Sequence, residues 1–167
     1  FEAAADYWRS TLDAPGVLTW AARDDTGSYV GCVRLVLAPL PNAQHRGEVS
    51  KLLVSRAARG HGVASRLLDV ADEEARARAR TLLLLDTETG SPAESLYRAR
   101  GWQPYGFVPG HALRTDGTMG DTTFTKPRCD SPAALVAFSN VPSPRLRNSV
   151  LGVSSWPTNR SSRPARS

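Results

Sequence analysis

An apolar strand, a basic turn with two glycines and the start of a helix follow one another in EVSKLLVSRAARGHGVA, residues 48–64. Gly60 and Gly62 permit positive φ values and allow a ligand to approach the backbone closely. The free N–H groups of a helix's first turn and the helix macrodipole favour an anion at this point. Arg56 and Arg59 add guanidinium donors that suit phosphate oxygens. The stretch predicts a phosphate-binding turn; the alternative is an ordinary strand–helix turn in which the glycines serve packing.

Two common phosphate-binding patterns do not fit this turn. The pattern GxxxxGK[ST] is absent, and the dinucleotide pattern GxGxxG fails because Ser65 stands where the third glycine is required. What remains is the arrangement Arg59-x-x-Gly62-x-Ala64 directly after an apolar strand. If the turn binds a phosphate group, it therefore belongs to a different kind of phosphate-binding motif.

Positive charge is concentrated at the C-terminal end of this chain of 167 residues. The net charge is +5, and residues 129–167 contribute +4 of it, from five arginines and one aspartate. This segment is rich in Ser, Pro and Arg and has little periodicity. We therefore expect a disordered tail at residues 128–167 after one folded domain at residues 1–127. Only one aromatic residue, Trp156, lies among these arginines, which argues against a nucleic-acid partner.

Neither membrane insertion nor metal binding is indicated by the sequence. No apolar run approaches the roughly 20 residues that span a bilayer. Cys32 and Cys129 give neither a disulfide framework nor metal-ligand spacing, and Cys32 fits a buried position in an apolar strand. We expect a cytoplasmic protein with no metal and no membrane partner. The chain begins with Phe1, which we interpret as the loss of an N-terminal segment.

Hydrophobic periodicity and turn residues predict an α/β protein with a mixed sheet. Helices are expected at residues 1–12, 62–80 and 92–100, and strands at residues 17–23, 29–38, 48–55, 82–85, 103–108 and 121–126. A polar loop is expected at residues 109–120. The continuous apolar run at 82–85 is typical of a strand with a parallel neighbour. The helix from residue 62 has an inward stripe of Val63, Leu67, Val70 and Ala71, and Glu74 and Arg78 pair beyond it.

The sequence SPAESLYRARGW, residues 91–102, contains both a helix start and a helix end. Ser91 and Glu94 form a capping box with proline at the first helical position, and Gly101 suits the position after the last turn. The turn at residues 59–64 resembles motif A of the GNAT family of N-acetyltransferases. In that family a helix with the pattern A-x-x-[LF]-Y-x-x-x-G-[FW] follows later in the chain. The residues that match it in order are Ala93, Leu96, Tyr97, Gly101 and Trp102.

The resemblance implies the GNAT acyl-CoA N-acyltransferase fold over residues 1–127, without clear counterparts of the family's first strand and first helix. It also implies acetyl-coenzyme A (acetyl-CoA) as cosubstrate, with its pyrophosphate in the glycine turn. The pantetheine arm would pair with the preceding strand where the sheet splays apart, and backbone there would supply the oxyanion donor. The residues expected to bind the coenzyme are Leu53, Val54, Arg59, Gly60, His61, Gly62, Val63, Ala64, Ser65 and Tyr97, with His61 contributing its backbone.

Three side chains are candidates for the implied reaction, in which an amine loses a proton and a thiolate leaves. Glu48 resembles the family's glutamate base; the alternative is a solvent-exposed carboxylate at the edge of a strand. Asp86, expected at the end of the neighbouring strand, could bind the substrate ammonium or share the base role; the alternative is a turn residue. Tyr97 resembles the family's tyrosine acid, with an ordinary phenol pKa of about 10; the alternative is a core tyrosine.

A narrower resemblance concerns the acetyl acceptor. Glu48-Val49-x-Lys51-Leu52, residues 85–94 and Gly117-x-x-x-x-Thr122 look like the tabtoxin resistance protein and its relatives. These acetylate small amino compounds, so the resemblance implies a small-molecule amine, an amino acid or an amino-acid-like antibiotic as substrate. A protein N-terminal or lysine acetyltransferase and a non-catalytic CoA-binding module remain alternatives. We expect a monomer or homodimer, with residues 105–120 contributing to the acceptor pocket.

Overall fold

The computed structural model describes residues 2–12 and 14–127, so the predicted tail at 128–167 lies outside the described residues. The helices and strands are α1 (Glu2–Leu12), β1 (Val17–Arg23), β2 (Tyr29–Leu37), β3 (Arg46–Val54), α2 (Val63–Ala77), β4 (Leu82–Glu88), α3 (Pro92–Ala99), β5 (Trp102–Leu113) and β6 (Met119–Pro127). Short 3₁₀ turns lie at Pro41–Ala43 and Arg56–Ala58. Within this part of the chain, no helix has the length and apolar character needed to cross a membrane.

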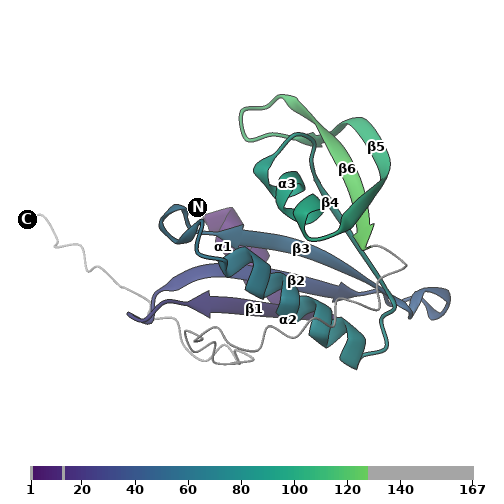
Figure 1. Cartoon of the computed structure of the whole chain (residues 1–167), viewed down its shortest axis with the longest axis horizontal. Helices are drawn as coiled ribbons and strands as arrows, with labels where there is room; N and C mark the ends of the chain where they lie inside the picture. The colour runs from purple at the N-terminus through teal and green to yellow at the C-terminus, as the bar shows by residue number, and fades with distance from the viewer. Residues whose placement is uncertain (1, 13, 128–167) are drawn as a thin grey trace, which may run out of the picture.

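The strands form one six-stranded mixed sheet in the order β1-β2-β3-β4-β6-β5 (Figure 1). β3 and β4 are parallel, and the other neighbouring pairs are antiparallel. Parallel neighbours need a crossover connection, which α2 provides between β3 and β4. The sheet confirms the predicted mixed α/β class and the parallel neighbour expected for residues 82–85.

β3 and β4 are paired over only a short distance. Residues 46–48 of β3 lie opposite residues 82–84 of β4, and beyond them the two strands take different partners. β3 continues beside β2 as far as Val54, whereas β4 pairs with β6 from residue 85 to residue 88. The sheet therefore opens between β3 and β4, and its two parts stand apart in Figure 1.

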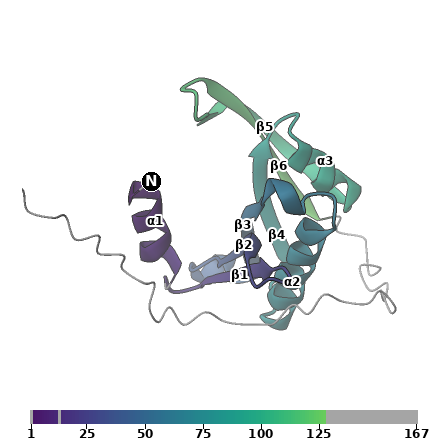
Figure 2. The ribbon, with the colours of Figure 1, turned by 90° about the vertical axis from the view of Figure 1, so that its left-hand side faces the viewer.

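The two long helices lie on opposite faces of β1, β2 and β3 (Figure 2). α2 packs on the sheet through a buried stripe made of Leu67, Leu68, Ala71 and Ala75. Leu67 and Ala71 confirm the predicted stripe, and Ala75 continues it further along the helix than predicted. The strands contribute Val33, Leu35 and Val49 to the same core.

α2 is shorter than the helix predicted at residues 62–80. Gly62 is its N-cap residue, and the helix ends at Ala77. Ala79 then has a φ of 56°, in the left-handed region where a helix cannot continue. The predicted pair near this end is present, because Arg78 Nε and Glu74 Oε1 form an ion pair at 2.7 Å.

The loop predicted at residues 109–120 is wrong, because β5 continues to Leu113 and β6 begins at Met119. The register of this strand pair shifts between Val108 and Ala112, and Gly110 within the shift has a φ of 58°. Pro109 and Gly110 therefore mark a bulge inside a strand, and not its end. The same kind of long-range pairing extends β4 beyond its predicted end at residue 85, since β6 pairs with it up to residue 88.

α3 begins and ends as its sequence predicts. The Glu94 N–H donates to Ser91 Oγ at 3.2 Å, and Gly101 after the helix has a φ of 82°. The second half of the capping box differs, because the Glu94 carboxylate accepts from the Gly90 N–H at 2.6 Å. The Ser91 N–H donates to Glu88 O at 3.2 Å and therefore has a different partner.

Candidate active site

β3 has an open edge toward β4 after Glu48. Within the described residues, no strand pairs with this side of β3 beyond the third paired position. Lys51 has a φ of 53°, and the register of β3 against β2 shifts at this point, as expected for a bulge. Leu53 and Val54, the residues predicted beside the pantetheine arm, lie on this segment, and Leu53 is 53% exposed. The structure thus provides a strand edge whose backbone groups have no strand partner in the described part of the chain and could pair with an added extended ligand.

The glycine turn joins β3 to α2. Gly60 and Gly62 have φ values of 77° and 76°, and a Cβ on either would meet nothing within 4 Å. The first intrahelical hydrogen bond runs from the Arg66 N–H to Gly62 O at 3.1 Å. The N–H groups ahead of this bond belong to Val63, Ala64 and Ser65. Gly62 has no side chain to cap them, so these donors face open space and fit the pyrophosphate of a coenzyme.

Arg59 and His61 stabilise the turn through local hydrogen bonds. Arg59 Nε donates to Val54 O at 3.4 Å, and His61 Nδ1 lies 2.9 Å from Arg59 O. Both residues are exposed. Among the described residues, the two terminal nitrogens of Arg59 have no hydrogen-bond partner, so they can reach an anion held in the turn.

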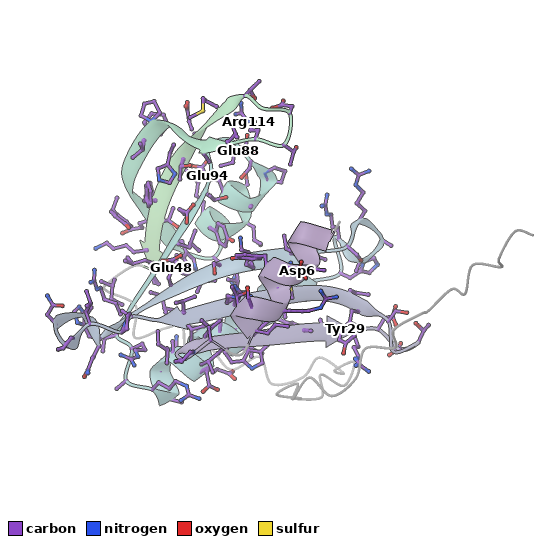
Figure 3. All side chains as sticks on the ribbon, turned by 180° about the vertical axis from the view of Figure 1, so that it is seen from behind. Asp6, Tyr29, Glu48, Glu88, Glu94 and Arg114 are labelled. Atoms are coloured by element: carbon purple, nitrogen blue, oxygen red, sulfur yellow. The ribbon has the colours of Figure 1, made fainter. Side chains whose placement is uncertain are left out.

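Glu48 and Asp86 lie on either side of the point where β3 and β4 part. Glu48 is opposite Leu84 in the last paired position, and Asp86 follows two residues later on β4. Desolvation raises the pKa of Glu48 above its usual value, and the negative charge of Asp86 raises this pKa further. Figure 3 shows Glu48 where β3 meets the foot of the part formed by β4, β5 and β6. A carboxylate with a raised pKa is a better proton acceptor than an ordinary one.

Asp86 is not at the end of its strand, so this part of the prediction is wrong. β4 continues to Glu88, and Asp86 lies opposite Phe124 in the pairing with β6. It is exposed and therefore points its charge into a solvent-accessible region beside Glu48. The alternative interpretation of Asp86 as a turn residue does not fit this position within a strand.

Tyr97 is a core residue and also lies within the field of Asp86. It is 6% exposed, and its ring lies 5.9 Å from the ring of Trp102. Desolvation, followed by the charge of Asp86, raises the pKa of Tyr97 to about 12. The phenol is therefore a weaker acid than the ordinary value of about 10 implies, and it remains protonated at neutral pH. It can donate its proton or a hydrogen bond to a developing thiolate.

Aromatic residues of β5 and β6 form a surface beside Asp86. The sequence did not predict which residues form this surface. Phe124 is the cross-strand neighbour of Asp86, and its ring lies 6.3 Å from Tyr105 and 5.2 Å from His111. The sequence predicted only that residues 105–120 contribute to an acceptor pocket. Their grouping depends on the pairing of β4, β6 and β5, for which no local signal exists.

The sequence matches the model of the Acetyltransferase (GNAT) family over residues 1–102. This range includes the glycine turn, both candidate carboxylates and α3. The chain belongs to the GNAT acetyltransferase family. The family uses acetyl-CoA as its cosubstrate, so the resemblance stated from the two motifs is confirmed at the level of the family and its fold.

Similar proteins have different acceptors in their names. N-alpha-acetyltransferase 30 of Saccharomyces cerevisiae is 31% identical over 90 residues, which are 51% of each chain. The chain thus spans about half the length of this curated relative. The structure of ribosomal-protein-alanine N-acetyltransferase from Brucella melitensis is 26% identical with a TM-score of 0.63, covering 74% of this chain and 76% of that one. Nourseothricin acetyltransferase is 27% identical with a TM-score of 0.59, covering 69% and 66%.

Metal ligands do not gather in the part of the chain that the structure describes. No group of three or more His, Cys, Asp or Glu side chains within residues 2–12 and 14–127 could hold a metal ion.

Proposed function

We propose that the protein transfers the acetyl group of acetyl-CoA to the amine of a small molecule. The observation that supports this most strongly is the position of Glu48 and Asp86. Two carboxylates, one with a raised pKa, lie where the sheet opens, beside a strand edge that leads to the glycine turn. Binding, orientation and proton removal can all take place in this one region.

The coenzyme would bind along β3 and the glycine turn. Its pyrophosphate would accept hydrogen bonds from the N–H groups at the start of α2, with Arg59 as an added cation. The pantetheine arm would lie against the open edge at Leu53 and Val54, as a peptide does when it adds to a sheet. The thioester carbonyl would then lie near backbone N–H groups of β3 that stabilise the oxyanion.

The transfer proceeds by direct attack of the amine on the thioester carbonyl. Glu48 removes a proton from the ammonium, directly or through a water, and Asp86 binds the ammonium or shares the base role. The nitrogen–carbon bond forms, the carbon–sulfur bond breaks, and the thiolate receives a proton from Tyr97. No covalent intermediate with the enzyme is needed.

The test is an assay of free thiol with acetyl-CoA and a panel of amines and amino acids. Turnover with small amines supports the proposal. Tight binding of acetyl-CoA without turnover of any acceptor would identify a non-catalytic CoA-binding module. The variants Glu48→Gln and Tyr97→Phe then test the two roles, and an unchanged kcat in both would refute the assignment.

The second candidate is acetylation of a protein N-terminus, which the names of two relatives favour. One is called an N-alpha-acetyltransferase and the other a ribosomal-protein-alanine N-acetyltransferase. The name of nourseothricin acetyltransferase favours a small acceptor instead. Hexapeptides with free N-termini, assayed beside the corresponding free amino acids, separate the two candidates. Specificity of the tabtoxin resistance type, and a monomeric or homodimeric state, stay predictions.

A further inference from the structure

Arg34 is a buried cation without a counter-ion among the described side chains. It lies in the middle of β2 and is 4% exposed. Its Nη2 donates to Thr11 Oγ1 at 2.9 Å, but its Nε is buried and has no hydrogen-bond partner. Residues 5–12 and 14–127 provide no carboxylate that pairs with it. An unpaired buried charge is costly, so its presence needs a reason.

A second unpartnered polar atom lies beside this guanidinium. Thr19 of β1 is directly opposite Arg34 in the pairing of β1 with β2, so both side chains are on the same face of the sheet. Thr19 Oγ1 is also buried and without a hydrogen-bond partner. Side chains in such a pair have their Cβ atoms about 5 Å apart. A guanidinium N–H and a hydroxyl thus lie on directly opposed residues of neighbouring strands, and each lacks a partner.

Aromatic rings of α1 cover the guanidinium. Its central carbon lies 4.7 Å from the ring centre of Trp8 and 5.8 Å from that of Tyr7. These rings stabilise the cation but cannot accept the in-plane hydrogen bond that Nε offers. The rings therefore leave the buried Nε donor without an acceptor.

A cavity lies beside this pair of donors: Thr19 lines it, Arg34 is the cross-strand neighbour of Thr19, and the cavity extends to Leu53 of β3. It has a volume of about 540 Å³ and is lined by Trp8 and Leu12 of α1, Thr19 of β1, Cys32 of β2 and Leu53 of β3, among others. Leu53 is the residue placed beside the pantetheine arm in the proposed function. A molecule in this cavity can therefore reach the coenzyme.

Arg34 is on the same face of the sheet as Glu48. Arg34 lies opposite Ser50 and Val36 lies opposite Glu48, in a regular stretch of the pairing between β2 and β3. Residues two positions apart on a strand share a face, so Arg34 and Glu48 are diagonal neighbours. Their Cα atoms are then about 7–8 Å apart. This spacing lets one small molecule contact both side chains.

We propose that Arg34 and Thr19 bind the carboxylate of the acetyl acceptor, which is therefore a small amino acid or a compound resembling one. The inference rests on the proposed function and names its substrate class. The ammonium of the acceptor lies toward Glu48 and Asp86, and its carboxylate accepts hydrogen bonds from Arg34 Nε and Thr19 Oγ1. The largely apolar cavity holds the remaining side chain.

The test compares two acceptors that differ only in the carboxylate. The best substrate among the twenty standard L-amino acids is assayed beside the amine formed from it by decarboxylation. In Arg34→Gln we expect KM for the amino acid to rise about 10- to 100-fold, because a hydrogen bond to a charged group is lost. We expect kcat, and KM for the decarboxylated amine, to change less than about 3-fold.

Two further variants separate recognition from a structural role. Thr19→Val keeps the shape of its side chain and removes only the hydroxyl, and we expect KM for the amino acid to rise about 3- to 10-fold. Arg23→Gln removes an exposed arginine from β1, one that stacks on Tyr29 with its central carbon 4.2 Å from the ring centre. This control should leave both acceptors unaffected. Equal losses for both acceptors in Arg34→Gln and Thr19→Val would overturn the inference.

Direct binding distinguishes failure of this inference from failure of the proposed function. The twenty amino acids are titrated against the full chain and against Arg34→Gln by calorimetry. Binding that depends on Arg34, in a protein that acetylates nothing, would retain the carboxylate site and reject the proposed function. Turnover of amines with no preference for a carboxylate, together with equal binding by both proteins, would retain the function and reject the carboxylate site.

Discussion

The negative charge of Asp86 raises the pKa of Glu48 across the point where β3 and β4 part. Desolvation contributes the larger share of this shift. Two like charges near one site resist ionising together, so one of them retains its proton to a higher pH. Glu48 is thereby a stronger proton acceptor than an ordinary glutamate, and Asp86 is the charge that adds to the rise of its pKa.

Asp86→Asn should move the acidic limb of the pH dependence of kcat/KM to lower pH. Removal of the negative charge favours ionised Glu48, so the pKa of Glu48 falls. The absolute rate also decreases if Asp86 binds the ammonium, but the midpoint of the limb reports the pKa alone. The control is Glu88→Gln, because Glu88 pairs with Arg114 at 2.6 Å (Figure 3). An unshifted limb in Asp86→Asn would contradict the coupling.

Glu48→Gln should decrease kcat and stabilise the fold at neutral pH. Loss of a general base costs about 10²- to 10⁴-fold in rate. The raised pKa means that the folded state disfavours the ionised form, so native stability is lost as pH rises above the ordinary value of 4.5. Glutamine removes this cost. In urea unfolding at pH 7, the variant should therefore have the larger free energy of unfolding. Below pH 4.5 the two proteins should have equal free energies of unfolding.

A stability difference that is the same at both pH values would mean that Glu48 has the same pKa in the folded and unfolded states. A variant with unchanged kcat would remove Glu48 from the catalytic role, whatever its stability. The two readouts therefore test the pKa shift and the function independently.

Tyr97→Phe should separate the catalytic role of the Tyr97 hydroxyl from the packing of its ring. The ring packs against Trp102 at 5.9 Å and is retained by phenylalanine, so the free energy of unfolding should change by less than about 1 kcal/mol. kcat should fall by about 10²-fold if the phenol protonates the thiolate. Because the pKa of Tyr97 is about 12, the native protein should show no basic limb from Tyr97 below about pH 10.

Gly62→Ala should weaken both the fold and the binding of acetyl-CoA. Gly62 has a φ of 76°, and left-handed backbone costs a residue with a Cβ about 1–2 kcal/mol. Gly27 in the turn between β1 and β2 has a φ of 84° and equally open surroundings. Gly27→Ala should therefore show the same loss in urea unfolding while KM for acetyl-CoA stays constant. A KM that rises equally in both variants would remove the glycine turn from the coenzyme site.

The local features of this fold were readable from the sequence because they depend on neighbouring residues. Ser91 and Gly101 bound α3 through contacts within one helical turn, and Gly60 and Gly62 adopt the positive φ values that their turn requires. The family resemblance rests on the same local motifs, so the family and its fold were predictable without any tertiary contact.

The parts that could not be predicted depend on residues far apart in the chain. The predicted strand ended before Pro109 and Gly110 because these residues are typical of a loop. In the structure, pairing with β6 continues β5 beyond them. From the sequence, Arg34 and Thr19 could be assigned only to two strands. No local pattern indicates that both side chains have a polar atom without a hydrogen-bond partner, or that rings of α1 cover Arg34. Their meaning comes from the register of β1 with β2, which the sequence does not specify.

Gly31→Ala should destabilise the fold and disturb the coenzyme site together. A Cβ at this position would lie 2.9 Å from Leu53 O, 3.1 Å from Leu67 Cδ1 and 3.2 Å from Val63 Cγ1. The first contact is with backbone, which cannot rotate away, so we expect a loss of about 1–3 kcal/mol in urea unfolding. Val63 begins α2 and Leu53 lies on the open edge of β3, so KM for acetyl-CoA should rise as well.

Gly106→Ala provides the comparison for this last variant. Gly106 also lies in a strand, but a Cβ there would first meet Phe124 Cβ at 3.7 Å, which is an ordinary contact. We expect this change to cost less than about 1 kcal/mol and to leave KM for acetyl-CoA unchanged. If Gly31→Ala proves as mild as Gly106→Ala in both measurements, α2 and β3 can move apart freely. The close packing of α2 on β2 would then not position the coenzyme turn.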